Sequence, residues 1–282
     1  MLRIAVPNKG TLSRPAAEML REAGYRQRTD DRDLVCRDDA NEVEFFYLRP
    51  RDIATYVGSG DLDLGITGRD LLIDAGAPAR EVLDLDFAGA SFRFAARPQT
   101  LAGAGEVGGR RIATSFPGVV QSYLTERGLR ADVIRLDGAV ENAIRLGVAD
   151  VIADVVETGA TLRQAGLAVV GEPILRSSAV LIAGADTRDP DHRTAQLVRR
   201  LQGVLVARRY VMLAYDVRAD LLDRATRLTP GIESPTISPL HRAGWVAVQA
   251  MVLRGDVHKI MDELYDLGAR AILVTDIHAC RL

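Results

Sequence analysis

Short apolar segments alternate with amphipathic segments through the first two-thirds of the chain. Apolar runs bounded by turn residues are typical of strands, and apolar residues three to four positions apart are typical of helices. Strands are predicted at 2–6, 43–48, 63–67, 91–97, 110–114, 132–136 and 150–156, and helices at 13–24, 115–128 and 138–147, with short helices opening at 68–70 and after 157–161. A polar turn is predicted at 49–52. This alternation favours parallel sheets with helices on both faces, in two lobes that divide near residue 91 and rejoin near residue 180.

The pattern changes after a polar segment at 184–194 and a helix predicted at 195–208. From there, the order of predicted elements is strand, helix, short strand, strand, helix and strand, within about seventy residues. A β-α-β-β-α-β order of this length is typical of a ferredoxin-like unit. The sequence therefore predicts a separate C-terminal domain.

Composition narrows the class of protein. A chain of 282 residues suits two or three domains, and 48% hydrophobic with 26% charged residues is ordinary for a globular protein. The net charge of −2 argues against a nucleic-acid partner. We expect no membrane partner and a cytoplasmic location, because there is no run of 18 apolar residues and no signal-peptide pattern at the N-terminus. Cys36 and Cys280 are expected to be reduced thiols.

An acid interrupts the apolar strand at 151–156. Asp154 lies inside it, and Thr158, Gly159 and Thr161 follow at the predicted start of a helix. Helix N-termini bind phosphate, glycine lets the backbone approach an anion, and a carboxylate accepts hydrogen bonds from sugar hydroxyls. The stretch therefore suits a ribose-5-phosphate group. A capped helix, with Asp154 in a local hydrogen bond, explains the same residues.

Other charged or aromatic residues also follow predicted strands. They are the cations Lys9, Arg49 and Arg51, the acids Asp70 and Glu141, and the aromatic Phe116. Each taken alone is explained by a solvated loop, a helix cap or a core ring. In open α/β sheets, however, ligands bind at the carboxyl ends of parallel strands, so we expect these residues to line one site for a phosphorylated, sugar-bearing substrate. All four histidines lie beyond residue 190, and a metal is expected to be Mg²⁺ brought by the substrate.

Seven motifs in order extend this interpretation: RIAVPNKG, YLRPRD, DLDLGITGRD, RIATSFPG, LDGAVE, ADVIADVVETGATL and GIESPTISPL. Together they resemble the long form of the ATP phosphoribosyltransferase family, which catalyses the first step of histidine biosynthesis. The resemblance implies an α/β fold: a two-lobed, type II periplasmic-binding-protein-like catalytic core and a C-terminal ferredoxin-like (ACT-like) regulatory domain. Lobe I would comprise 1–90 and 180–210, lobe II 91–179, and the regulatory domain 211–282.

The resemblance also implies a reaction and roles for individual residues. N1 of the ATP adenine would join C1 of phosphoribosyl pyrophosphate and expel pyrophosphate, with Mg²⁺ on the substrate phosphates and no metal ligand assigned to the protein. The implied catalytic residues are Lys9, Arg49, Arg51, Glu141 and Asp154. The implied phosphoribosyl pyrophosphate site is Asp154, Glu157, Thr158, Gly159, Ala160 and Thr161, and the implied ATP contacts are Asp70 and Phe116. The family more often has lysine at position 51 and tyrosine at position 116.

L-histidine would act as a feedback inhibitor bound by the C-terminal domain. The residues implied for its site are Asp216, Ser234, Thr236 and Ala271, and the family resemblance suggests dimers that assemble into hexamers. Two alternatives remain open on the same fold: a non-catalytic small-molecule sensor and a catalytically silent regulatory subunit. The intact phosphate-loop residues favour the enzyme.

Overall fold

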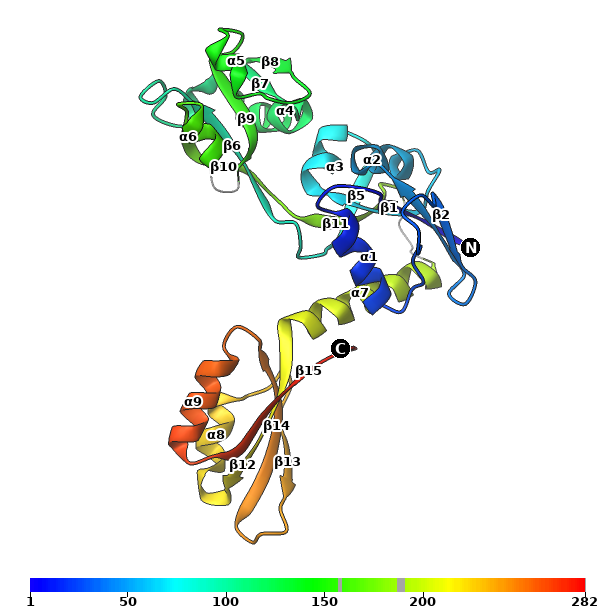
Figure 1. Ribbon diagram of the computed structural model, residues 1–282, viewed down its shortest axis with the longest axis vertical. Coiled ribbons are helices and arrows are strands. Elements are labelled where there is room, and N and C mark those ends of the chain that lie inside the picture. The colour runs from blue at the N-terminus through cyan, green and yellow to red at the C-terminus, as the bar shows by residue number, and fades with distance from the viewer. Residues whose placement is uncertain (157–158, 187–190, 282) are drawn as a thin grey trace. The chain divides into compact units, whose positions relative to one another are not determined.

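The computed structural model describes residues 1–156, 159–186 and 191–281 (Figure 1). The chain divides into two compact units, one of residues 1–21 and 25–194 and one of residues 22–24 together with the chain from residue 195 onward. The division falls near the start of helix α7 (His192–Arg209). Most of this helix therefore groups with the C-terminal unit rather than with lobe I, where the sequence places it.

Lobe I is a mixed sheet of six strands in the order β2–β3–β1–β4–β11–β5. The strands are β1 (Leu2–Pro7), β2 (Val35–Asp38), β3 (Val43–Leu48), β4 (Leu64–Gly68), β5 (Ala79–Asp84) and β11 (Ala179–Gly184). The helices are α1 (Ser13–Glu22), α2 (Pro50–Gly58) and α3 (Arg69–Ala75). The polar turn predicted at 49–52 is wrong, because Pro50 begins α2. Proline suits the first turn of a helix, and Ile53, Ala54 and Val57 bury the inner face of α2 on the sheet.

Lobe II is a mixed sheet of five strands in the order β10–β6–β9–β7–β8, with helices on both faces. The strands are β6 (Ala90–Ala96), β7 (Arg111–Thr114), β8 (Asp132–Arg135), β9 (Val151–Val156) and β10 (Ala168–Ser177). The helices are a 3₁₀ turn η1 (Ala104–Val107), α4 (Pro117–Glu126), α5 (Asn142–Arg145) and α6 (Ala160–Gln164). Helix α5 is shorter than the predicted 138–147, since Ala139 and Gly147, near the two ends of that range, have positive φ angles of 48° and 73°.

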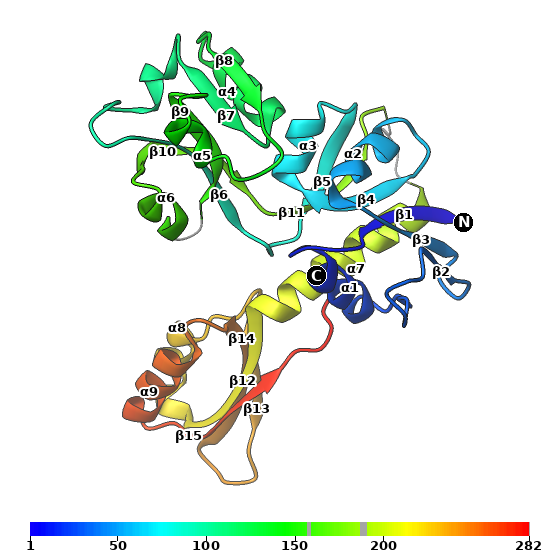
Figure 2. The same ribbon diagram turned by 45° about the horizontal axis from the view of Figure 1, so that its top comes forward.

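The prediction of parallel sheets is confirmed for three strands in each lobe, and it is wrong for the strands next to the crossovers and for β2, which is antiparallel to β3. β1 runs parallel to β3 and β4, and β7 runs parallel to β8 and β9. β11 is antiparallel to β4 and β5, and β6 is antiparallel to β9 and β10. The chain enters lobe II through β6 and returns to lobe I from β10 to β11, so these strands take their direction from the crossovers (Figure 2).

The two crossover segments are hydrogen-bonded to each other. The backbone N–H of Leu85 donates to the carbonyl of Ala179 at 2.9 Å, and the N–H of Ala179 donates to the carbonyl of Phe87 at 2.9 Å. Asp86 and Ala88 have positive φ angles of 55° and 51°, which non-glycine residues rarely adopt. The passage between the lobes is therefore a paired, sharply turned strip rather than two independent linkers.

The C-terminal unit has the predicted β-α-β-β-α-β order. Its sheet has the order β13–β14–β12–β15, and every neighbouring pair is antiparallel. The elements are β12 (Tyr210–Arg218), a 3₁₀ turn η2 (Ala219–Leu221), α8 (Leu222–Leu228), β13 (Thr236–Pro239), β14 (Trp245–Leu253), α9 (Val257–Leu267) and β15 (Arg270–Asp276). Helices α8 and α9 cover one face of the sheet over a core that includes Leu213, Tyr215 and Leu264 (Figure 1). The ferredoxin-like prediction is confirmed.

Candidate active site

Asp154 lies where β9 leaves the core of lobe II. Ile152, two residues earlier on the same face of the strand, packs in the core beneath α5 and α6. Asp154 continues along that face beyond the core and lines a cavity of about 270 Å³ together with Glu141, Gly159 and Thr161. The structure thus brings together the predicted acid, the predicted second acid and the described part of the predicted phosphate loop.

Two carboxylates facing one cavity change the acidity of Asp154. Burial raises the pKa of the Asp154 carboxyl above its ordinary value of 3.8, and the negative charge of Glu141 raises that pKa further. The backbone N–H of Val155, which donates to Asp154 Oδ1 at 2.8 Å, acts in the opposite direction. A partly buried carboxylate beside a second acid favours hydroxyl donors or developing positive charge in the cavity.

The start of α6 forms the other wall. Gly159, at the N-cap, has a φ of 67° and a ψ of 13°, a left-handed conformation that glycine adopts without strain. Ala160 and Thr161 are exposed in the first turn of the helix. Glu157 and Thr158, also predicted for this site, lie outside the described residues.

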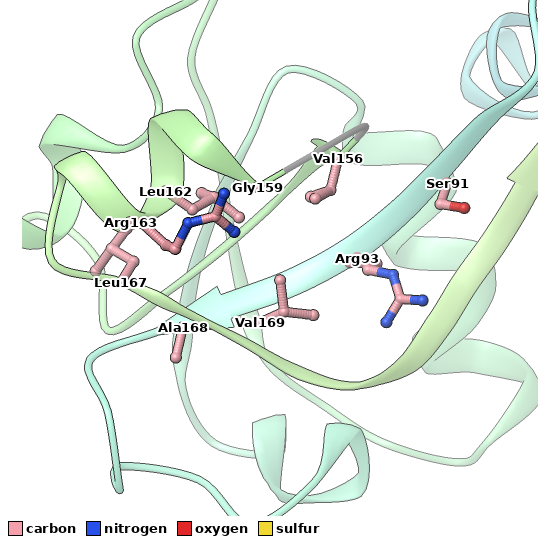
Figure 3. A pocket seen from close by; sticks show the side chains of 9 residues that line it. All are labelled: Ser91, Arg93, Val156, Gly159, Leu162, Arg163, Leu167, Ala168 and Val169. Carbon is pink, nitrogen blue, oxygen red and sulfur yellow. The ribbon is translucent and has the colours of Figure 1, made fainter.

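A second cavity, of about 510 Å³, also borders Gly159 (Figure 3). Its walls carry two arginines, Arg93 from β6 and Arg163 from α6, whose guanidinium groups Figure 3 shows on either side of Val169. Arg93 Nη1 donates to the carbonyl of Gly171 at 3.2 Å. A side chain at position 159 would place its Cβ 3.3 Å from Arg163 Nη1. Gly159 therefore borders both an acid-lined and an arginine-lined cavity.

Lys9 and Arg49 lie just beyond the carboxyl ends of two neighbouring strands of lobe I. They follow the adjacent parallel strands β1 and β3, and the N–H of Asn8 donates to the carbonyl of Leu48 at 2.8 Å. Both side chains are exposed. The side-chain oxygen of Asn8 is buried and has no hydrogen-bond partner within the described parts of the chain. Sequence reasoning did not select Asn8, although it directly precedes Lys9.

Arg51 and Phe116 come into contact, although they belong to different lobes. Arg51 Cζ lies 4.8 Å from the ring centroid of Phe116, within the range of a cation–π interaction. The Phe116 ring packs edge-on against Phe92 with the centroids 5.3 Å apart. Arg51 Nη1 also lies 2.7 Å from Asp74 Oδ2, so this predicted site residue already has a carboxylate partner.

Asp70 faces the crossover between the lobes. Its Oδ1 accepts a hydrogen bond from Ser177 Oγ at 2.8 Å, and Ser177 Oγ accepts one from the Asp70 N–H at 3.0 Å. Gly68 is the N-cap residue of α3, and Asp70 makes its side-chain bond to Ser177. The predicted ATP contact is therefore tied to the segment through which the chain returns from lobe II.

The four residues implied for histidine binding are spread across the C-terminal sheet. Thr236 begins the edge strand β13, Ala271 lies on the opposite edge strand β15, and Asp216 lies on β12 between them. Thr236 and Ala271 are three strand spacings apart, or about 14 Å. Ser234 is exposed just before β13. A single chain thus does not gather these four residues around one ligand.

The described residues lack both a cluster of metal ligands and a membrane-spanning helix. In residues 1–156, 159–186 and 191–281, no three His, Cys, Asp or Glu side chains are grouped so that they could hold a metal ion. Over the same residues, the helices lack the combination of length and apolarity that a membrane span needs.

These features define a two-lobed α/β protein with an added ferredoxin-like domain. The family described as ATP phosphoribosyltransferase matches residues 49–203, and the family described as HisG, C-terminal domain, matches residues 207–279. The chain belongs to the ATP phosphoribosyltransferase family, in its long form, and is therefore an enzyme of the pentosyltransferase class.

Relatives support this membership along the whole chain. The ATP phosphoribosyltransferase of Salinispora tropica is 73% identical over 282 residues, and that of Streptomyces coelicolor is 62% identical over 286 residues, each alignment covering 100% of both chains. A chain in the solved ATP phosphoribosyl transferase (HisG:HisZ) complex from Thermotoga maritima is 27% identical, with a TM-score of 0.60, covering 73% of this chain and 98% of that one. The sensor and silent-subunit alternatives are not favoured.

Proposed function

We propose that the chain joins ATP to 5-phosphoribosyl 1-pyrophosphate, giving N1-(5-phosphoribosyl)-ATP and pyrophosphate, as the first committed step of L-histidine biosynthesis. The observation that carries the proposal is the acid-lined cavity of lobe II. Asp154 and Glu141 face it, and Gly159 with Thr161 at the start of α6 closes it. These are the groups that a ribosyl phosphate needs, in a chain related over its full length to named ATP phosphoribosyltransferases.

Asp154 and Glu141 would act on the ribose. The N1 lone pair of adenine forms a bond to C1 while the C1–O bond breaks and its electron pair leaves with pyrophosphate, so the sugar gains positive charge in the transition state. Two carboxylates in a partly buried cavity stabilise such charge, and Asp154 also accepts hydrogen bonds from the ribose hydroxyls. The 5-phosphate would bind at the start of α6, where Gly159 and Thr161 line the cavity.

The cations of lobe I would receive the leaving group. Lys9 and Arg49 are exposed just beyond the carboxyl ends of β1 and β3. Nε and Nη2 of Arg51 donate to no acceptor in the described parts of the chain. We assign Mg²⁺ to the substrate phosphates, where it would neutralise charge on pyrophosphate. The residues present fit this assignment, because the cavity offers only two carboxylates, fewer than the oxygen ligands that a protein would need to hold Mg²⁺ without a substrate.

Adenine would bind near Phe116 and Asp70. Since Arg51 already lies over the Phe116 ring, nucleotide binding and the contacts of Arg51 with phosphate would be coupled. Phenylalanine offers a stacking face without the hydroxyl that the family more often has at this position.

L-Histidine would bind the C-terminal sheet and inhibit by favouring a less active arrangement, since coupling requires different affinities for two states. Because Thr236 and Ala271 lie on opposite edges of the sheet, a second copy of the chain would have to supply part of each site. This supports the dimers and hexamers that the resemblance implies, and we propose that the enzyme works in the cytoplasm.

Pyrophosphate release from the purified protein tests the function. The expected result is release that requires ATP, phosphoribosyl pyrophosphate and Mg²⁺ together and decreases with added L-histidine. Omission of either substrate, and chelation of Mg²⁺, serve as controls. Release that is insensitive to histidine would contradict the regulatory part alone, whereas release with one substrate omitted would contradict the proposed reaction.

A further inference from the structure

Asp74, near the C-terminal end of α3, bonds to groups from both lobes. Its Oδ2 lies 2.7 Å from Arg51 Nη1 in lobe I, and its Oδ1 accepts a hydrogen bond at 2.8 Å from the backbone N–H of Gly118 in lobe II. The Asp74 side chain is 9% exposed, against 43% for that of Arg51. Both carboxylate oxygens of this largely buried side chain are thus committed, one to each lobe.

The contact with lobe II is close enough to require glycine. A Cβ at Gly118 would lie 2.7 Å from the Cα of Asp74, nearer than real Cβ atoms approach. Ile73, the neighbour of Asp74, packs against the lobe II core that contains Phe92 and Val120. Helix α3 is therefore seated on the start of α4, with Gly118 as the point of closest approach.

The other end of α3 is fixed to the crossover. Arg69 pairs with Glu81 and Asp84, each at 2.8 Å, and its Nη1 donates to Ser178 Oγ at 3.0 Å. One short helix thus contacts both the strip that connects the lobes, through Arg69, and the facing lobe, through Asp74. A movement of one lobe relative to the other would therefore have to break the hydrogen bond between Asp74 and Gly118, or α3 would have to move together with lobe II.

Asp74 also determines which donors of Arg51 remain for a ligand. Nη1 of Arg51 is used twice, toward Asp74 Oδ2 and toward the carbonyl of Ser115 at 3.2 Å. A guanidinium has five N–H donors. In the described parts of the chain Nε and Nη2 of Arg51 donate to no acceptor, so the ion pair leaves them for phosphate oxygens and holds the group over Phe116.

We propose that Asp74 is a positioning residue for phosphoribosyl transfer: it joins the lobes through Gly118 and orients Arg51 over Phe116 for the pyrophosphate group. The proposal rests on the role assigned to Arg51 in the proposed function. Asp74 does not touch substrate, and its effect on the rate passes through Arg51 and through closure of the two lobes. Displacement of a charged group by about 1 Å costs up to about 100-fold in rate.

A double-mutant cycle separates positioning from a general structural role. Asp74→Asn keeps an oxygen acceptor for Gly118 but removes the charge opposite Arg51, and Arg51→Gln removes the positioned group. We expect Asp74→Asn to lower kcat/KM for pyrophosphate release by about 10- to 100-fold and Arg51→Gln by about 100-fold or more. The double variant should lose no more than Arg51→Gln alone, because the two residues act as one unit.

Hydrogen exchange of the full-length protein tests the bridge without any activity. Asp74→Ala removes the acceptor of the Gly118 N–H, so peptides that contain Gly118 should exchange about tenfold faster. Asp150→Asn is the matched control, because it removes an aspartate–arginine pair of similar length, Arg111 to Asp150 at 2.8 Å, that lies within lobe II. It should change neither the kinetics nor the exchange at Gly118.

Distinct results would overturn the proposal. Losses that multiply in the double variant would mean that Asp74 acts independently of Arg51, and wild-type kinetics in Asp74→Asn or Arg51→Gln would remove the positioning role. Unchanged exchange at Gly118 in Asp74→Ala would remove the bridge between the lobes. A wild-type protein that released no pyrophosphate would contradict the proposed function, while exchange at Gly118 would still decide whether Asp74 joins the lobes.

Discussion

Glu141 and Asp154 face the same cavity in lobe II, and the charge of Glu141 adds to burial in raising the pKa of Asp154. The two residues reach this cavity from separate elements, Glu141 from the start of α5 and Asp154 from the end of β9. The raised pKa of Asp154 should therefore affect two measurable quantities, the free energy of unfolding and the pH dependence of kcat/KM.

Asp154→Asn should separate activity from stability. A buried acid whose pKa is raised by folding costs folding free energy above its folded pKa, and this cost decreases as the pH falls through the folded pKa toward the ordinary value of 3.8. Asparagine removes the charge and keeps an acceptor for the Val155 N–H. We expect kcat to fall by about 100-fold or more, with the free energy of unfolding at pH 7 equal to that of the wild type or above it. Steady-state kinetics and urea unfolding measure the two quantities. An unchanged rate would remove Asp154 from the chemistry.

The acid limb of the pH–rate profile should reflect the raised pKa of Asp154. If the reaction needs the Asp154 carboxylate, kcat/KM will fall on acidification at a pH above 3.8, the ordinary value for aspartate. Glu141→Gln removes the neighbouring negative charge, so the midpoint of this limb should move to lower pH, whatever the change in absolute rate. Midpoints that coincide in the two proteins would show that Glu141 does not influence the titrating group.

Phe116→Tyr should change the KM for ATP by a few-fold with little change in stability. The ring stays stacked beneath Arg51, and the added hydroxyl meets the proposed nucleotide region. Tyr123→Phe, which alters a ring packed on Phe94 in the lobe II core, is the control and should leave the KM for ATP unaltered. If both variants keep the wild-type KM, residue 116 lies outside the nucleotide site.

Asp216→Asn should weaken histidine inhibition. Asp216 lies on β12, in register with Ala247 of β14, and the resemblance implies that its carboxylate pairs with a cationic group of the ligand. Loss of such a charge-assisted hydrogen bond, worth about 1.5–3 kcal/mol, predicts a rise of roughly tenfold or more in the histidine concentration that halves the rate. Asp262→Asn, an exposed change on α9, should keep the wild-type response. Equal inhibition of both variants would place the effector elsewhere.

Local patterns predicted the elements whose burial is regular. The apolar run at 43–48 predicted β3 with its observed bounds, and in the structure every second side chain of this strand is buried on the sheet. Helix α2 was missed, since Arg49, Pro50, Arg51 and Asp52 have the composition of a turn, and Pro50 as a first-turn residue was the signal that could have identified the helix.

The crossover strands, and contacts between residues far apart in the sequence, were harder to predict from the sequence. Strand β10 contains Gly171 and Pro173, which interrupt a strand pattern, and its pairing with β6 depends on residues more than 70 positions away. Asp154 was found because an acid in an apolar strand is conspicuous. Asp74 had no such signal, since its partner Arg51 comes from another helix of lobe I and its partner Gly118 from lobe II, so only the tertiary fold brings them together.

The phosphoribosyl cavity is the central claim, and a single-turnover reaction analysed by mass spectrometry tests it most directly. Excess wild-type enzyme with ATP, phosphoribosyl pyrophosphate and Mg²⁺ should form one adduct, ATP plus a ribosyl phosphate, with an equal amount of pyrophosphate. Asp154→Asn under the same conditions should form this adduct at least about 100-fold more slowly. Formation of the adduct at equal rates by both proteins, or consumption of phosphoribosyl pyrophosphate without any adduct to ATP, would contradict the account.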